Sequence, residues 1–126
     1  MAFGDVGGAV TELVITCKTK GSGTVAISKG DAVKLTDAYT VDNATDAEDV
    51  VFGQALADAK DNGLAIPVKV RGIAIFAYDG AAPELDGASG VLASATDGKV
   101  KAPASGNGVG INVKVDGAAG KVHVLL

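Results

Sequence analysis

Eighteen glycines divide the chain into short segments in which apolar and polar residues tend to alternate. Alternation with a period of two is typical of β-strands that bury one face, and glycine favours the tight turns between such strands. No stretch of the sequence sustains the periodicity of an amphipathic helix. The pattern therefore predicts an all-β fold of short strands, and it leaves a small barrel and a two-sheet sandwich as alternatives.

The sequence carries one hairpin-like pattern twice. Residues 51–70 read VFGQALADAKDNGLAIPVKV, and residues 109–126 read VGINVKVDGAAGKVHVLL. Three glycines also recur 57 residues later: Gly30, Gly53 and Gly63 match Gly87, Gly110 and Gly120. Because neither unit could hide its sheet face alone, we expect two similar β-units to pack into one small domain with an internal two-fold pseudo-repeat.

The beginning of the sequence is different in character. Residues 1–9, MAFGDVGGA, are small and glycine-rich, which predicts an extended arm, and residues 10–18, VTELVITCK, read as the first strand. We therefore divide the chain into an arm with its first strand at residues 1–24 and a β-barrel-like domain at residues 25–126. Pro67 lacks an N–H donor, so its strand is expected to be an edge strand or to be paired on one side there.

Size and charge limit the classes of protein that fit. A chain of 126 residues suits one domain, and it is long enough to bury about two-thirds of its surface without disulfides. The formal net charge is −4, with 11 basic and 15 acidic residues and no basic block. Nucleic-acid binding requires a positive surface, so we expect no nucleic-acid partner. The first ten residues predict neither a signal peptide nor a membrane span, and we expect no membrane partner.

The residues that could perform chemistry are few and isolated. Cys17 and His123 are the only cysteine and the only histidine, so a zinc site built from four such ligands is excluded. Cys17 is expected to be a buried, inert thiol, and His123 to face solvent or a subunit contact. The carboxylates at Asp46, Glu48 and Asp49 lack the spacing of a calcium loop and predict a solvated loop. SGNGVG at 105–110 lacks the GxGxxG spacing and predicts a turn. We therefore expect no enzyme activity, no cofactor and no metal.

The order of the sequence blocks resembles a known family. ISKGDAVKL is followed by a polar loop and then by VVFGQALADAKDNGLAIPVKVRGIAIF, and the sequence ends with VGINVKVDGAAGKVHVLL. This order, over roughly residues 20–126, resembles the head decoration, or capsid cement, proteins of tailed bacteriophages. The quoted blocks contain no catalytic signature, so the resemblance lies in a succession of glycine-rich hairpins.

The resemblance implies a structural function. Such a protein is made in the host bacterial cytoplasm and resides on the outer capsid surface of the virion. There it would bind the major capsid protein of the expanded icosahedral head, commonly as a homotrimer, and stabilise the head by bridging capsid subunits. The family carries no catalytic residues to transfer.

A glycine-rich arm joined to an alternating strand suggests where contacts would form, because such an arm can add a strand to a neighbour's exposed edge. We expect capsid or subunit contacts to involve the apolar residues of the arm and first strand, together with the proline strand. These residues are Phe3, Val6, Val10, Leu13, Ile15 and Pro67.

Two other functions remain open from the sequence. The chain could be another β-rich virion or tail component, which would bind particles only at the tail. It could also be a small-ligand or carbohydrate-binding β-domain. Sugar-binding sites favour exposed aromatic side chains, and the chain has no Trp, which leaves Tyr39 and Tyr78 as the candidates for such a site.

Overall fold

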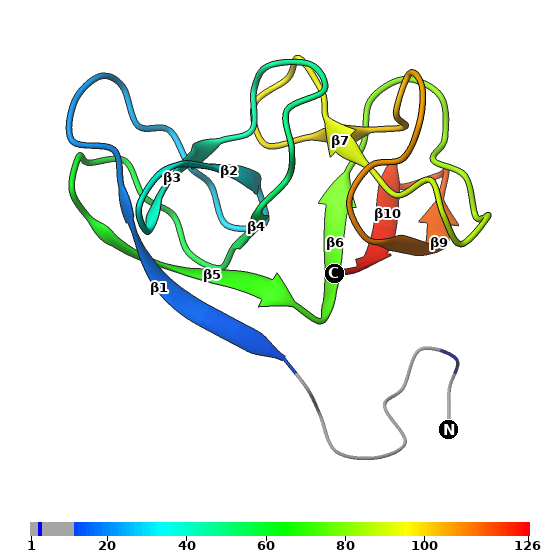
Figure 1. The fold of residues 1–126 in the computed structure, drawn as a ribbon, viewed down its shortest axis with the longest axis horizontal. Helices are drawn as coiled ribbons and strands as arrows, with labels where there is room; N and C mark the ends of the chain where they lie inside the picture. Colours follow the sequence, from blue (N-terminus) through cyan, green and yellow to red (C-terminus); the bar gives the residue numbers. More distant parts are fainter. Residues whose placement is uncertain (1–2, 4–11) are drawn as a thin grey trace.

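The computed structural model describes Phe3 and residues 12–126, which form ten β-strands and no helix (Figure 1). The strands are β1 (Leu13–Thr19), β2 (Ala32–Asp37), β3 (Thr40–Asn43), β4 (Gly53–Ala55), β5 (Ala65–Arg71), β6 (Ile73–Ala77), β7 (Leu92–Ala93), β8 (Val100–Lys101), β9 (Ile111–Asp116) and β10 (Lys121–Leu125). The predicted all-β class is confirmed, and the structure decides for a barrel.

The first five strands close a small barrel in the order β1-β3-β2-β4-β5. All neighbours in this barrel are antiparallel except β1 and β3, which run parallel. The interior is filled by aliphatic side chains from alternating strand positions, as the period-two pattern requires. The barrel lies on the left of Figure 1.

The last five strands repeat this pairing. The strands β6, β10 and β9 form one sheet, and β7 and β8 form a hairpin. Two isolated bridges join them, a parallel one from Tyr78 at the end of β6 to Val100 in β8 and an antiparallel one between Val91 and Val109. The resulting order, β6-β8-β7-β9-β10, is that of the first barrel with each strand replaced by its counterpart. The internal pseudo-repeat predicted from the glycines is therefore confirmed.

Individual residues occupy matching positions in the two repeats. Thr19 pairs in parallel with Val41 in the first repeat, as Tyr78 pairs with Val100 in the second. Val41 and Val100 are both fully buried. The first repeat therefore begins at β1, whose counterpart is β6, and the duplication includes a strand that the glycine spacing did not reveal.

Two of the recurring glycines explain why the spacing is preserved. A Cβ on Gly53 would lie 2.5 Å from the backbone oxygen of Lys69 in the neighbouring strand. A Cβ on Gly110 would lie 2.8 Å from the backbone oxygen of Leu125 and 2.5 Å from the Val124 side chain. At both positions the adjacent strand is too close for any side chain, so each repeat requires glycine where its fourth strand begins.

The two repeats form one domain because they share a core. One cluster of buried residues fills the first barrel, and a second cluster fills the other repeat around Phe76. The second cluster also includes Ala32, Ala44 and Val51 from the first repeat. The amide of Ala32 donates to the carbonyl of Gly98 at 2.9 Å, which joins the repeats through their backbones as well.

The structure places β1 and β5 inside the barrel. β1 pairs with both β5 and β3, so a boundary at residue 24 does not separate this strand from the barrel. β5 lies between β1 and β4, and the edge-strand alternative for Pro67 is therefore wrong. The carbonyl of Pro67 accepts from the Leu56 amide at 3.0 Å, just beyond the end of β4. The missing N–H thus falls where the ladder between β4 and β5 ends, which is the one-sided pairing that the sequence left open.

Substitution of the two glycines in the last hairpin separates steric clash from backbone conformation. Gly110 and Gly120 both have positive φ, at 75° and 65°, but a Cβ on Gly120 would meet no atom within 4 Å. We expect Gly120→Ala to cost about 1–2 kcal/mol, because a Cβ disfavours this conformation. Gly110→Ala should cost about 1–3 kcal/mol more through overpacking. Urea unfolding of both variants measures the difference, and equal losses would contradict the close strand approach.

Candidate interaction surface

The two isolated candidates for chemistry do not meet. Cys17 is 2 % exposed in the core of the first barrel, and burial raises the pKa of its thiol, which keeps it protonated and unreactive. His123 lies on β10 in the second repeat, between the buried Val122 and Val124 and therefore on the outer side of the sheet. A nucleophile–base pair between the two residues is absent from the structure.

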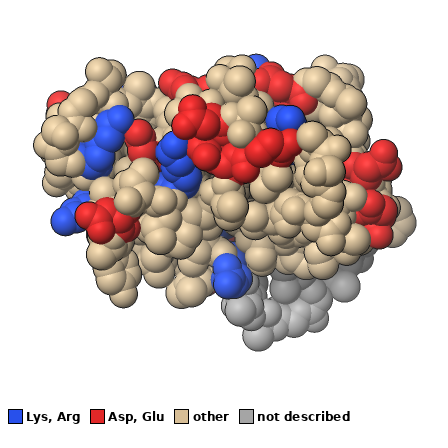
Figure 2. All heavy atoms as spheres, turned by 45° about the horizontal axis from the view of Figure 1, so that its top comes forward, with Lys and Arg blue, Asp and Glu red and all other residues tan. Residues whose placement is uncertain are grey.

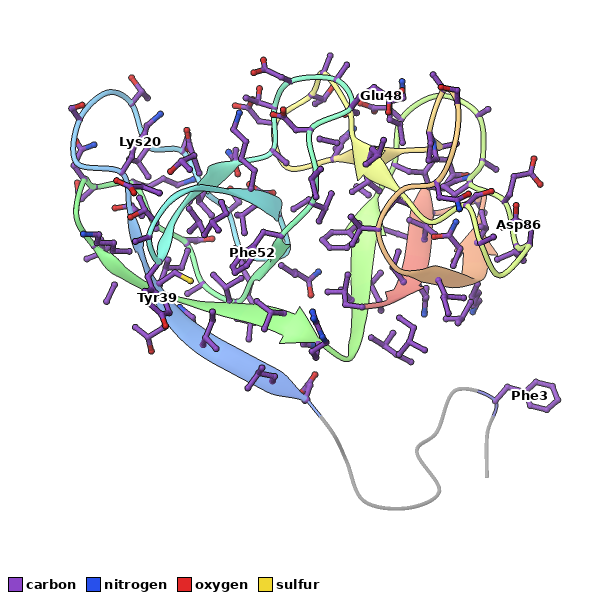
Figure 3. The ribbon with its side chains drawn as sticks, viewed as in Figure 1. Phe3, Lys20, Tyr39, Glu48, Phe52 and Asp86 are labelled. Atoms are coloured by element: carbon purple, nitrogen blue, oxygen red, sulfur yellow. The ribbon has the colours of Figure 1, made fainter. Side chains whose placement is uncertain are left out.

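The acidic loop is held by lysines. The Nζ atom of Lys34 lies 2.8 Å from Asp49 and 3.5 Å from Asp46. Glu48 accepts from the Ala104 amide at 2.9 Å and lies 3.2 Å from Lys101, and the two contacts, the amide first, lower the pKa of its carboxyl. The loop was predicted to be simply solvated, but Asp49 is paired with Lys34, and Glu48 connects the first repeat to the second. Figure 2 shows acidic side chains gathered beside lysines, and Figure 3 places Glu48 on this loop.

A hollow of about 410 Å³ lies beside this loop, and it is lined mainly by alanine and glycine. Its polar side chains are already engaged with one another. Ser94 donates to Asp79 at 2.8 Å, and hydrogen bonds from Thr96 and Ser94 lower the pKa of Asp79. Lys101 is paired with Glu48. Among residues 12–126, no group of three or more His, Cys, Asp or Glu side chains could hold a metal ion.

The most unusual surface is the outer side of the β6-β10-β9 sheet. In its register, Ile73, Leu125 and Ile111 lie opposite one another in a row across the three strands. The next row contains Ile75, His123 and Lys114, and a bulge at Val113 adds a further aliphatic side chain. Five large aliphatic residues on this side are exposed, and we call them the apolar face: Ile73, Ile75, Ile111, Val113 and Leu125. Contiguous exposed apolar patches often mark interaction sites, whereas scattered single apolar residues are common on any protein surface.

The corresponding positions on β4 and β5 of the first repeat are polar. In the first repeat, Gln54 of the fourth strand lies opposite Lys69 of the fifth. The same register position in the second repeat holds Ile111 opposite Leu125. Lys69 is also paired with Glu12 at 2.6 Å. The interior pattern has been kept in both repeats while the outer side has become aliphatic in one, so the apolar face is not a requirement of the fold.

The residues predicted to make contacts are dispersed. Phe3 is fully exposed and lies away from the strands (Figure 3), and Leu13 is half exposed at the start of β1. Ile15 is partly buried against the barrel core, and Pro67 is partly buried on β5. Val6 and Val10 lie outside the described residues. The apolar face was missed, although IAIFA at residues 73–77 signals it by being apolar at every position, as a strand buried on both sides would be.

Comparison with known proteins does not assign the chain, since neither a protein-family model nor a curated protein sequence matches it. Within the described part of the chain, no helix is long and apolar enough to cross a membrane. The inference of function therefore depends on the surfaces themselves.

Changes on the apolar face should leave the fold intact. We expect Ile75→Thr and Leu125→Lys each to change the free energy of unfolding by less than about 1 kcal/mol, because both residues are nearly half exposed. The control Val122→Thr lies on the opposite side of the same strand β10 and is fully buried, so an unpaired hydroxyl there should cost about 1–3 kcal/mol. Urea unfolding tests this, and losses for the face variants as large as for the control would show that the face supports the core.

The hydrogen bonds of Asp86, in the loop before β7, should make the stability of the protein depend on pH in acid. Its carboxylate accepts from the Ser89 hydroxyl, the Ser89 amide and the Ala88 amide, and these bonds lower its pKa from 3.8 to about 2. A carboxylate with a lowered pKa contributes stability above its unfolded value, and this contribution is lost as the pH falls through the folded value. Asp86→Asn should therefore be less stable than the native chain at neutral pH, and the gap should close as the pH falls from 4 to about 2. Denaturant midpoints at several pH values measure this gap, and a constant gap would contradict the assignment.

Proposed function

We propose that this protein is a head decoration, or capsid cement, protein of a tailed bacteriophage. It would bind the outer surface of the expanded icosahedral head and bridge major capsid subunits. Two observations support this function. The block order of residues 20–126 resembles that family, and the confirmed all-β fold agrees with the compact β-barrel that the resemblance implies.

The observation that carries the proposal is the apolar face. A small domain with five exposed aliphatic residues on one sheet suits adhesion to a protein surface better than binding of a small molecule. The described polar groups in the hollow and in the acidic loop are paired with one another, which leaves few free groups to recognise a ligand. A homotrimer would strengthen a weak contact per domain, because several sites would engage the head at once.

A ligand-binding domain is the second candidate, and the hollow beside Asp79 favours it. Sugar recognition commonly uses exposed aromatic side chains, yet Tyr78 packs against the second core cluster. Tyr39 is 70 % exposed on the β2–β3 turn of the other repeat, so the two tyrosines do not form a shared platform. Sugar binding therefore has less support from this structure than adhesion.

Co-sedimentation tests the proposed function directly. The purified chain is mixed with DNA-filled heads and with unexpanded precursor shells of the phage that encodes it, and bound copies per particle are counted. We expect saturable binding at hundreds of copies per head, with preference for expanded heads, because one copy or trimer would occupy each repeated capsid site. A few copies per particle would indicate a vertex or tail component, and no binding to either particle would overturn the proposal.

A matched pair of variants connects the apolar face to this binding. Leu125→Lys places a charge on the face, whereas Leu85→Lys changes a similarly exposed leucine in the loop that follows β6. We expect the first change to lower the number of copies bound at a given concentration and the second to leave it unchanged. Equal binding by both variants would show that the apolar face does not contribute to head binding.

A further inference from the structure

The contact between the two repeats shows what can pack against the outer side of this β-unit. Residues 73–77 of β6 pair with β10 on one side, and on the other side, within the described chain, only Tyr78, just beyond the strand, is bridged to Val100. On this other side of β6, the Gln54 amide donates to the carbonyl of Ile75 at 2.8 Å, and the Lys69 ammonium donates to the carbonyl of Ile73 at 3.1 Å. Side chains from the outer positions of β4 and β5 thus cover the free edge of the next repeat's first strand.

The counterparts of Gln54 and Lys69 have no such neighbour within the described chain. Gln54 is 8 % exposed and the Lys69 side chain is 15 % exposed, because β6 lies against them. Ile111 and Leu125, at the matching positions of the second repeat, are 42 % and 43 % exposed. The same position is therefore covered in one repeat and open in the other.

The counterpart of the covered edge is open as well. Within the described residues, β1 pairs with β3 only through Lys18 and Thr19, so residues 13–16 face no strand on the side away from β5. We call this side of residues 13–16 the β1 edge. Leu13 and Val14 on this stretch are 50 % and 43 % exposed. If the repeats were related by a true two-fold axis, Ile111 and Leu125 would cover the β1 edge within the same chain.

The relation between the repeats is therefore directional, and a directional contact leaves one surface free at each end. We propose that these free surfaces meet between two copies of the chain, so that the apolar face of one copy packs head-to-tail on the β1 edge of the next. The occupant of the face is a second copy, because the chain itself already uses this arrangement once. This inference rests on the homotrimer included in the proposed function and assigns its contact surface, so the apolar face would support head binding by assembling the trimer rather than by touching the capsid.

The contact within the chain is polar, whereas the proposed contact between copies is apolar. Inside the chain, Gly72 joins β5 to β6, so the contact forms at a high effective concentration and two hydrogen bonds are sufficient. Between copies, association must offset the lost freedom of two molecules, which favours the burial of apolar side chains. Ile111 and Leu125 on one side, with Leu13 and Val14 on the other, provide aliphatic surfaces at the corresponding places. A head-to-tail contact can close into a ring, and three copies would bring six repeats together.

Sedimentation velocity of the purified full chain tests the contact without any capsid. We expect the native chain to form a closed oligomer, and Leu125→Asp and Val14→Asp each to weaken self-association by roughly tenfold or more. Leu85→Asp, which changes a leucine 60 % exposed outside both surfaces, should behave like the native chain. Ile111→Asp serves as a second face variant, and thermal unfolding confirms that each variant is folded.

A mixture of two variants determines the direction of the contact. Leu125→Asp keeps an intact β1 edge and Val14→Asp keeps an intact apolar face, so an equal mixture should form a dimer that neither variant forms alone. A native chain that stays monomeric would overturn the proposal. Loss of association with Leu125→Asp but not with Val14→Asp would show face-to-face pairing and would also overturn it. Head binding by a monomeric chain would refute this contact alone, whereas an oligomer that binds no head would refute only the proposed function.

Discussion

The interior of this protein is built from small aliphatic side chains, so its strands must approach one another closely for any core to form. Among the described residues, Phe76 is the only aromatic one that is fully buried, and valine and alanine supply most of the rest of the core. Gly53 and Gly110 permit that approach, because neither position has room for a Cβ. The narrow core also explains why the repeats do not stay separate, since alanines from the first repeat complete the second cluster.

The two repeats preserve their interior and differ in their exterior. Val41 and Val100 are equally buried at matching positions, whereas Lys69 in the first repeat corresponds to Leu125 in the second. Pairing between strands and burial inside a barrel constrain inward positions strongly, and outward positions are free to change. A duplicated unit can therefore keep its fold while one copy forms an internal contact and the other offers a surface to a partner.

Much of the fold could be predicted from the sequence. Alternation predicted the all-β class, and the 57-residue glycine spacing predicted the duplication. The strand face that Cys17 shares with Leu13 and Ile15 predicted a buried thiol. Closure of the barrel could not be predicted, because a barrel and a sandwich bury the same alternating positions. The place of β1 in the repeat was also hidden, since its counterpart β6 carries no matching glycine.

The candidate surface was less accessible to prediction. Ile73 and Ile75 read as core residues, because a strand that is apolar at every position is usually buried on both sides. Only the register with β10 and β9 shows that one side of this sheet lies open. The ion pair between Lys101 and Glu48 was hidden for a related reason, because these residues meet only after the two repeats pack together.

The single thiol distinguishes the interior of one repeat from that of the other. Cys17 is enclosed in the first barrel, and its counterpart in the second repeat is Phe76. A thiol reagent in solution can reach Cys17 only when the first barrel opens, so the labelling rate counts openings of that repeat alone. Compared with the rate of global unfolding, it distinguishes two nearly equivalent halves that open independently from two that open together.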